Sequence, residues 1–153
     1  MVFVTLGTQK QSFKRLLDMV ENSKELQNDE IIAQIGNTKY ESKKIKCFDF
    51  VDSEKLDEYI KNAEIIITHA GVGSIFSGLH NDKKVIAVPR LKKYKEHIND
   101  HQLEICEEMT KEGYILSCLE NEDLDEKIRK IRNMNLKKYE TNENFLEILK
   151  KEI

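Results

Sequence analysis

A short loop with two glycines, a histidine and a serine is the part of this sequence best suited to chemistry. It reads His69-Ala-Gly71-Val-Gly73-Ser74 and follows the apolar, β-branched run 65–68. The pattern predicts a buried strand that enters a helix through a tight turn. Glycines let a ligand approach the backbone, and the free N–H groups at a helix N-terminus favour an anion. We therefore expect a phosphate-binding turn, with His69 as a ligand contact rather than an ordinary core histidine.

A second loop of the same kind follows the first apolar run. Gly7 and Thr8 come directly after residues 2–6, which we expect to form a strand. In doubly wound sheets, ligands bind outside the carboxyl ends of the strands, where Gly7 would allow close approach and the Thr8 hydroxyl would donate to a phosphate. An ordinary strand-to-helix turn is the alternative, because a lone Gly-Thr pair is a weak signal. No G-x-G-x-x-G dinucleotide motif follows the strand.

The third polar stretch, residues 89–104, passes from a basic loop into a helix rich in hydrogen-bonding side chains. Such groups near a helix N-terminus suit the hydroxyls of a sugar. The lysines suit an anionic diphosphate or a lipid surface, although a solvated loop is the plain alternative. His97 and His101 are i, i+4 neighbours, but with Asp100 they converge poorly, so we expect no metal site. We find no Ser-His-Asp, Cys-His or paired-carboxylate set, and expect ligand binding without a complete catalytic set.

The elements that position these loops alternate between strand and helix patterns. We expect strands at 2–6, 31–35, 46–50, 65–68, 85–88 and 114–118. Most are separated by apolar stripes of helical spacing, and Asp52 with Ser53 predicts a helix start. This order predicts an α/β fold: a Rossmann-like doubly wound, mostly parallel sheet with helices on both faces. Residues 36–45 are too few for a helical crossover unless the link is abbreviated. The second and third strands are therefore expected to be antiparallel, or one of them an edge.

Composition narrows the class of protein. The chain has 153 residues, 25 basic and 28 acidic, and a net charge of −3, which argues against a nucleic-acid-binding surface. Cys47, Cys106 and Cys118 are odd in number and far apart, which is typical of reduced cytosolic thiols. No run approaches the ~20 apolar residues that span a bilayer, and the first apolar run is too short for a signal peptide. We expect one cytoplasmic domain over 1–153.

The three loops, taken in order, resemble the donor-nucleotide half of GT-B glycosyltransferases of the lipid-linked, MurG-like type. The motifs are FVTLGTQ at 3–9, THAGVGSI at 68–75, and VPR at 88–90 followed by EHINDHQLE at 96–104. The resemblance runs from Met1 to about Ser117. It is greatest to the stand-alone small subunit of two-chain enzymes, such as the eukaryotic dolichol-linked N-acetylglucosaminyl transferase and bacterial exopolysaccharide β-glycosyltransferases. It implies one half of a GT-B fold, with a UDP-sugar as substrate and no cofactor.

The resemblance also implies residue roles. The turn at Gly7 would contact the diphosphate, the backbone at Phe50 would read the uracil edge, and Gln102 would address the donor sugar. Ser77 stands where many relatives have a glutamate that holds the ribose, and Leu103 replaces a second glutamine. The full donor-binding set that we expect is Gly7, Thr8, Phe50, Val51, His69, Gly71, Gly73, Ser74, Asn99, Asp100 and Gln102.

The acceptor-binding half of these enzymes, which usually supplies the general base, has no counterpart in this chain. The resemblance therefore implies a membrane-associated acceptor-binding subunit as partner, with this chain held at the membrane through it. The segment 142–153 is the candidate dock, and packing on its own sheet is the equal alternative. The implied activity is hexosyl transfer from a UDP-sugar to a lipid-linked acceptor in polysaccharide or glycolipid synthesis, only with the partner.

In that reaction, loop amides, helix N-termini and Arg90 or a nearby lysine would stabilise the diphosphate leaving group. Two alternatives stay open: a non-catalytic enhancer of the same complex, which Ser77 favours, and a doubly wound module for another phosphate ligand.

Overall fold

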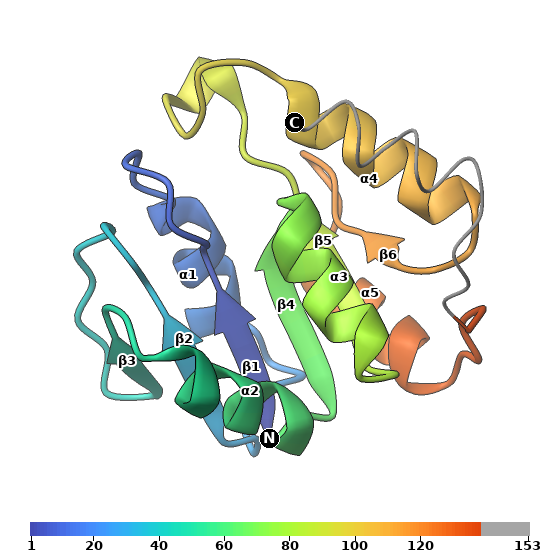
Figure 1. Ribbon diagram of the computed structural model, residues 1–153, viewed down its shortest axis with the longest axis horizontal. Coiled ribbons are helices and arrows are strands. Elements are labelled where there is room, and N and C mark those ends of the chain that lie inside the picture. The colour runs from blue at the N-terminus through green and yellow to red at the C-terminus, as the bar shows by residue number, and fades with distance from the viewer. Residues whose placement is uncertain (139–153) are drawn as a thin grey trace.

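A six-stranded parallel sheet carries the chain, in the order β3-β2-β1-β4-β5-β6. This computed structural model describes residues 1–138, so the expected docking segment 142–153 lies outside the described residues. The strands are β1 (Val2–Thr5), β2 (Ile31–Gln34), β3 (Ile45–Phe48), β4 (Ile65–His69), β5 (Lys84–Val88) and β6 (Leu116–Ser117). The helices are α1 (Lys14–Glu21), α2 (Ser53–Asn62), α3 (Val72–His80), η1 (Lys92–Tyr94), α4 (His101–Lys111) and α5 (Leu124–Arg132). Figure 1 shows β1 and β4 side by side in the middle of the sheet.

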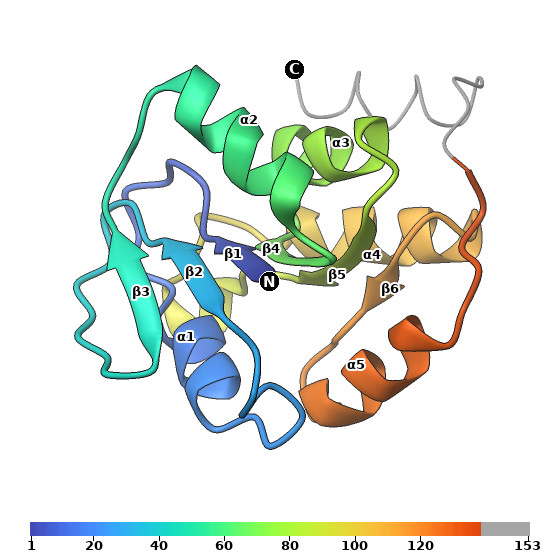
Figure 2. The same ribbon diagram turned by 90° about the horizontal axis from the view of Figure 1, so that it is seen from below.

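Apolar side chains alternate between the two faces of the sheet and form two cores. Val4 and Ile67 contribute to the core under α1 and α5, whereas Phe3 and Ile66 contribute to the core under α2, α3 and α4. Figure 2 shows α1 and α5 on one side of the sheet, and α2 and α3 on the other. Because successive strand residues point to opposite faces, each central strand buries both sets of side chains. The predicted doubly wound sheet with helices on both faces is confirmed.

The link between β2 and β3 differs from one expectation. The two strands are parallel, so the antiparallel alternative is wrong, whereas β3 is an edge strand as expected. The link returns as irregular chain along α1, where Tyr40 donates to Asp18 and Ser42 donates to Glu21. An extended chain covers about 3.3 Å per residue, so a short segment without a helix can span the length of a four-residue strand. The side chains of α1 therefore support the link between β2 and β3, which contains no helix of its own.

The boundaries around the second helix come close to the predicted ones. Asp52 is its N-cap and accepts a hydrogen bond of 2.8 Å from the backbone N–H of Lys55. That bond satisfies one of the free donors of the first turn. The third strand runs from Ile45 to Phe48 rather than over 46–50, which leaves Phe50 in the loop before the helix. Within residues 1–138, no helix is both long enough and apolar enough to cross a membrane.

Candidate functional site

A cavity of about 400 Å³ opens at the carboxyl ends of β1 and β4. After β1 the chain moves to β2 on one side, and after β4 it moves to β5 on the other, so the strand order reverses there. This reversal is where doubly wound sheets bind ligands. The lining residues are Phe3, Thr5, Gly7, Thr8, Gln9, Gln34, Leu56, Ile60, Ile66, His69, Gly71, Gly73, Ser74 and Ser77. Six of the predicted residues lie among them: Gly7, Thr8, His69, Gly71, Gly73 and Ser74.

The imidazole of His69 lies between two glycines from different loops. A Cβ atom built on Gly7 would collide with Nε2 of this ring, and one built on Gly71 would collide with its Cε1. Gly7 also has a φ of +73°, which disfavours other residues. The absence of a side chain at these two glycines therefore makes room for the ring. His69 is buried, with 5% of its surface exposed. Burial, followed by the nearby Arg90 charge, lowers its pKa to about 3, so the ring is neutral at physiological pH.

Helix α3 begins at the cavity and presents its N-terminus there. Gly71 is its N-cap, and no side chain satisfies the amides of the first turn at that cap. A Cβ atom on Gly73 would meet nothing within 4 Å, because the backbone faces open space. Ser74 shares a hydrogen bond of 3.2 Å with His69 Nε2. The open glycine and the amides of this helix N-terminus together suit an anionic ligand.

Two hydroxyls beside the cavity are engaged within the chain. The Ser77 hydroxyl donates to the Gly73 carbonyl at 3.0 Å, so its hydrogen is directed to the helix backbone. The Gly7 N–H donates to Thr5 Oγ1 at 3.3 Å, which leaves the Thr8 hydroxyl as the exposed polar group of that turn. The predicted diphosphate turn at Gly7 thus offers space and a hydroxyl more readily than its own amide.

Gln102 does not line the cavity; it lies beneath the loop after β4. Its Oε1 accepts from the backbone N–H of Ala70 and of Arg90, each at 3.1 Å. Its Nε2 lies 3.1 Å from Nδ1 of His69, and only 3% of the residue is exposed. Both ends of the amide are therefore used inside the protein, and the contact with a donor sugar stays a prediction.

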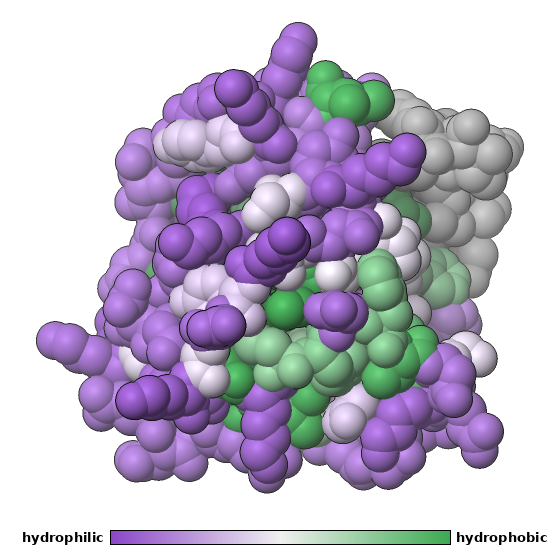
Figure 3. Space-filling model, turned by 90° about the vertical axis from the view of Figure 1, so that its left-hand side faces the viewer, coloured by the Kyte–Doolittle hydropathy of each residue, from purple (hydrophilic) through white to green (hydrophobic). Residues whose placement is uncertain are grey.

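The remaining predicted residues do not line the cavity. The ring of Phe50 is 51% exposed, and a Cβ atom on Gly36 would lie 3.5 Å from it. Val51 follows it in the loop before α2. Asp100 accepts from the backbone N–H of Lys92 at 2.9 Å, and Asn99 accepts from that of His101 at 3.0 Å. On the face seen in Figure 3 the surface is mainly hydrophilic, with apolar residues gathered in its middle.

Arg90, one of the two candidates for contact with the leaving group, lies inside the protein. Its guanidinium is buried, with 1% of the residue exposed, and donates to the backbone carbonyls of Leu6, Gln11 and Glu96. Burial lowers the pKa of Arg90 to about 10, so it remains charged at neutral pH. Leu6 and Gln11 belong to the loop after β1 and Glu96 belongs to the loop after β5, so Arg90 holds these two loops together. It supports the site from below and lies outside the cavity lining.

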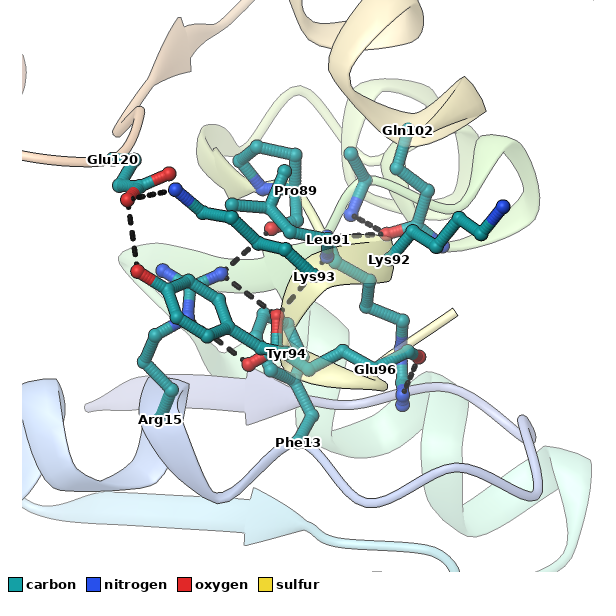
Figure 4. Close-up of polar contacts among 12 residues, drawn as sticks. Phe13, Arg15, Pro89, Leu91, Lys92, Lys93, Tyr94, Glu96, Gln102 and Glu120 are labelled. Carbon is teal, nitrogen blue, oxygen red and sulfur yellow. Dashed lines mark hydrogen bonds and ion pairs between the residues drawn. The ribbon is translucent and has the colours of Figure 1, made fainter. Parts of the chain in front are cut away.

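A second arginine completes this support (Figure 4). Arg15 pairs with the buried carboxylate of Glu96 through Nε at 3.0 Å and Nη2 at 2.9 Å. The same carboxylate accepts from the backbone N–H of Leu91 at 3.0 Å, and Tyr94 lies over Arg15. A bidentate arginine–carboxylate pair is geometrically demanding. It therefore orders the loop that carries residues 89–96, although the lysines there first suggested an anionic ligand.

Sequence reasoning missed a row of polar residues along one edge of the sheet. Thr5 pairs with Gln34 on one side and with Thr68 on the other, so three polar side chains lie in register. Thr5 and Gln34 line the cavity, together with Gln9 from the first loop. A polar residue at or next to the last position of three neighbouring apolar strands was the available signal. Among residues 1–138, no group of three or more histidine, cysteine, aspartate or glutamate side chains is placed to hold a metal ion.

Comparison with known proteins identifies the family. The glycosyltransferase family 28 C-terminal domain matches residues 1–153. The chain belongs to that family. It is 34% identical over 130 residues to the human UDP-N-acetylglucosamine transferase subunit ALG13, covering 76% of this chain and 11% of that protein. It is 35% identical over 77 residues to the subunit of the same name from Candida albicans, covering 50% of this chain and 25% of that protein. The domain thus spans a quarter or less of these two curated relatives.

Solved structures agree on the fold of the domain. An NMR structure of ALG13 matches with a TM-score of 0.65 and 22% identity, over 94% of this chain and 90% of that one. The calicheamicin glycosyltransferase CalG4 matches with a TM-score of 0.63 and 8% identity, over 99% of this chain and 36% of that one. The domain therefore has the Rossmann-like fold of one half of a GT-B glycosyltransferase, as the resemblance implied.

Proposed function

We propose that this domain is the donor-binding subunit of a two-component, inverting glycosyltransferase that uses a UDP-sugar without a metal ion. The observation that carries the proposal is the cavity where the start of α3, with the open backbone of Gly73, meets the loop of Gly7. The amides of that helix start and the hydroxyls of Ser74 and Thr8 suit two phosphate groups. The curated relatives are named as subunits of a UDP-N-acetylglucosamine transferase, which favours UDP-N-acetylglucosamine as donor.

The proposed transfer divides its tasks between two proteins. The acceptor hydroxyl attacks the anomeric carbon, its proton passes to a base on the partner, and the bond to the UDP oxygen breaks. The helix N-terminus beside Ser74 then stabilises the charge that develops on the diphosphate. The partner proposed here is a membrane-associated, acceptor-binding subunit, through which this domain reaches a lipid-linked acceptor. The segment 142–153 remains its proposed dock.

Titration calorimetry with UDP, UDP-N-acetylglucosamine and uridine tests donor binding. We expect both diphosphates to bind and uridine to bind far more weakly, because the site is built for an anion. Gly73→Val should abolish UDP binding while the domain stays folded, since the new side chain enters open space. Glu54→Val is the matched control, because it places the same residue at the second position of α2, exposed and outside the cavity lining. Equal affinity for uridine and UDP would contradict the proposal.

A transfer assay with a lipid-linked acceptor tests the division of tasks. We expect turnover only when the domain is combined with a membrane-associated partner, and weaker association after removal of residues from Phe145 onward. Robust turnover by the domain alone would refute the two-subunit proposal. Chelation by EDTA should leave turnover unchanged.

A non-catalytic enhancer is the second candidate, and the orientation of Ser77 favours it. Its hydroxyl hydrogen is directed to the Gly73 carbonyl, so it is a poor substitute for a ribose-binding carboxylate. An enhancer would show no measurable UDP binding by itself yet would raise the activity of its partner. The same calorimetry therefore separates the two candidates.

A further inference from the structure

A chain of hydrogen bonds joins the core of the domain to the cavity. It begins at two backbone amides, passes through Gln102 and His69, and ends at Ser74, which lines the cavity. The direction of each bond decides whether Ser74 offers the cavity a hydrogen or a lone pair. Backbone N–H groups can only donate, so they fix the direction of the bonds along the chain.

The amide of Gln102 has one possible orientation. Its oxygen lies 3.1 Å from the N–H of Ala70 and 3.1 Å from that of Arg90, and a backbone N–H can only donate. The reversed orientation would place an NH₂ group against two donors. The NH₂ group of Gln102 therefore faces Nδ1 of His69, at 3.1 Å.

This orientation sets the tautomer of His69. Since Gln102 donates to Nδ1, that nitrogen accepts and carries no hydrogen, and the neutral ring carries its hydrogen on Nε2. The ring cannot easily turn to escape, because Gly7 and Gly71 pass so close to its Cε1 and Nε2 atoms that neither position has room for a Cβ atom. Burial and the nearby Arg90 charge keep the ring neutral.

The tautomer in turn directs the hydroxyl of Ser74. Nε2–H of His69 donates to Ser74 Oγ at 3.2 Å, so the hydroxyl hydrogen is left to point elsewhere. In the opposite tautomer, Ser74 would donate to the ring and present lone pairs to the cavity, which would repel an anion. We propose that Gln102 is a positioning residue that holds His69 as its Nε2–H tautomer and thereby makes Ser74 a hydrogen-bond donor to the ligand. The identity of that ligand as a diphosphate rests on the proposed function.

This role differs from the sugar contact that the family resemblance implied for Gln102. A sugar contact would weaken UDP-sugar binding and spare UDP. A residue that acts through His69 and Ser74 supports the diphosphate, and its loss weakens both ligands equally.

The first test uses the unaltered domain and needs no ligand. Nitrogen NMR of the imidazole should show His69 as the Nε2–H tautomer alone, between pH 5 and 8. A predominant Nδ1–H tautomer, or a mixture of the two, would overturn the proposal. This measurement identifies the tautomer even if UDP does not bind. The positioning proposal can therefore be refuted independently of the proposed function.

The second test is a double-mutant cycle on UDP affinity. Gln102→Leu and Ser74→Ala should each lower affinity about tenfold or more, the size expected for one hydrogen bond to a charged ligand. In the Ser74→Ala background, Gln102→Leu should add less than about twofold, because both changes remove the same bond. Ile105→Val is the matched control, since it loosens the core side of α4 without touching this chain of bonds. Additive losses, or a loss for UDP-N-acetylglucosamine alone, would refute the positioning role.

Discussion

Replacing Gly71 by alanine tests whether His69 occupies the space beside it. The backbone there has φ −77° and ψ 133°, which any residue adopts, so the substitution introduces no backbone strain. The new Cβ atom would collide with Cε1 and lie 2.7 Å from Nε2 of His69. Overpacking of this kind costs about 1–3 kcal/mol, and the stiffer unfolded chain returns about 0.4–1 kcal/mol. Taking the middle of each range, we expect a net destabilisation of about 1.3 kcal/mol.

Gly73→Ala is the matched control, because it makes the same chemical change two residues along the chain. A Cβ atom at that position meets nothing within 4 Å. Alanine is favoured over glycine inside helices by about 1 kcal/mol, so this variant should be slightly more stable than the parent. Both changes should weaken UDP binding: Gly71→Ala because it displaces His69, and Gly73→Ala because its new methyl group enters the space proposed for the ligand.

Urea unfolding followed by circular dichroism is the suitable assay, because the chain has no tryptophan. The expected result is two opposite shifts of the midpoint at an unchanged slope. If Gly71→Ala were as stable as Gly73→Ala, the imidazole would not lie between the two glycines, and the reasoning about the site would fail.

Three further predictions follow from buried polar groups. The stability contributed by neutral His69 is complete above pH 6.5 and is lost as the pH falls from 6.5 to about 3, because the unfolded chain binds a proton that the native ring does not. Within this range the free energy of unfolding should fall by about 1.4 kcal/mol for each pH unit. Urea unfolding of the His69→Gln variant should show no such pH dependence. Glu96→Gln should cost about 1.5–3 kcal/mol by weakening charged hydrogen bonds in the core, measured by the same unfolding. Burial raises the pKa of Cys106 to about 12 and of Cys118 to about 11, so mass spectrometry after alkylation should find native label only on half-buried Cys47.

The sequence was sufficient to predict the sheet and the two loops that line the cavity. The reason is local: an apolar run that ends in glycine marks a strand end, and the carboxyl ends of parallel strands share one edge. The parallel pairing of β2 with β3 was not predictable in this way. It depends on side chains of α1 that support the link, such as Asp18, and these contacts are set by packing rather than by local pattern.

The roles of Gln102 and Arg90 could not be predicted from sequence, for a related reason. Arg90 begins and Gln102 ends a charged stretch that looks exposed in the sequence, yet both residues are buried. The role of a buried polar side chain depends on the backbone groups to which it forms hydrogen bonds. Those groups are distant in sequence, because Arg90 bonds to Leu6 and Gln102 bonds to Ala70. The contacts of Phe50, Asn99 and Asp100 with a ligand stay predictions.

The central place of β1 has a consequence for how the domain folds. Val2 pairs with Ile31 on one side and with Ile65 on the other, so β1, which is synthesised before both partners, lacks one neighbour until β4 has been made. Parallel pairings between distant segments form slowly, because the intervening chain must first be ordered. Until then the edge of β1 is open to pairing with other chains. Pairing with β4 closes that edge and, in the same step, brings His69 beside Gly7, so assembly of the binding site begins with the pairing that protects the nascent chain from aggregation.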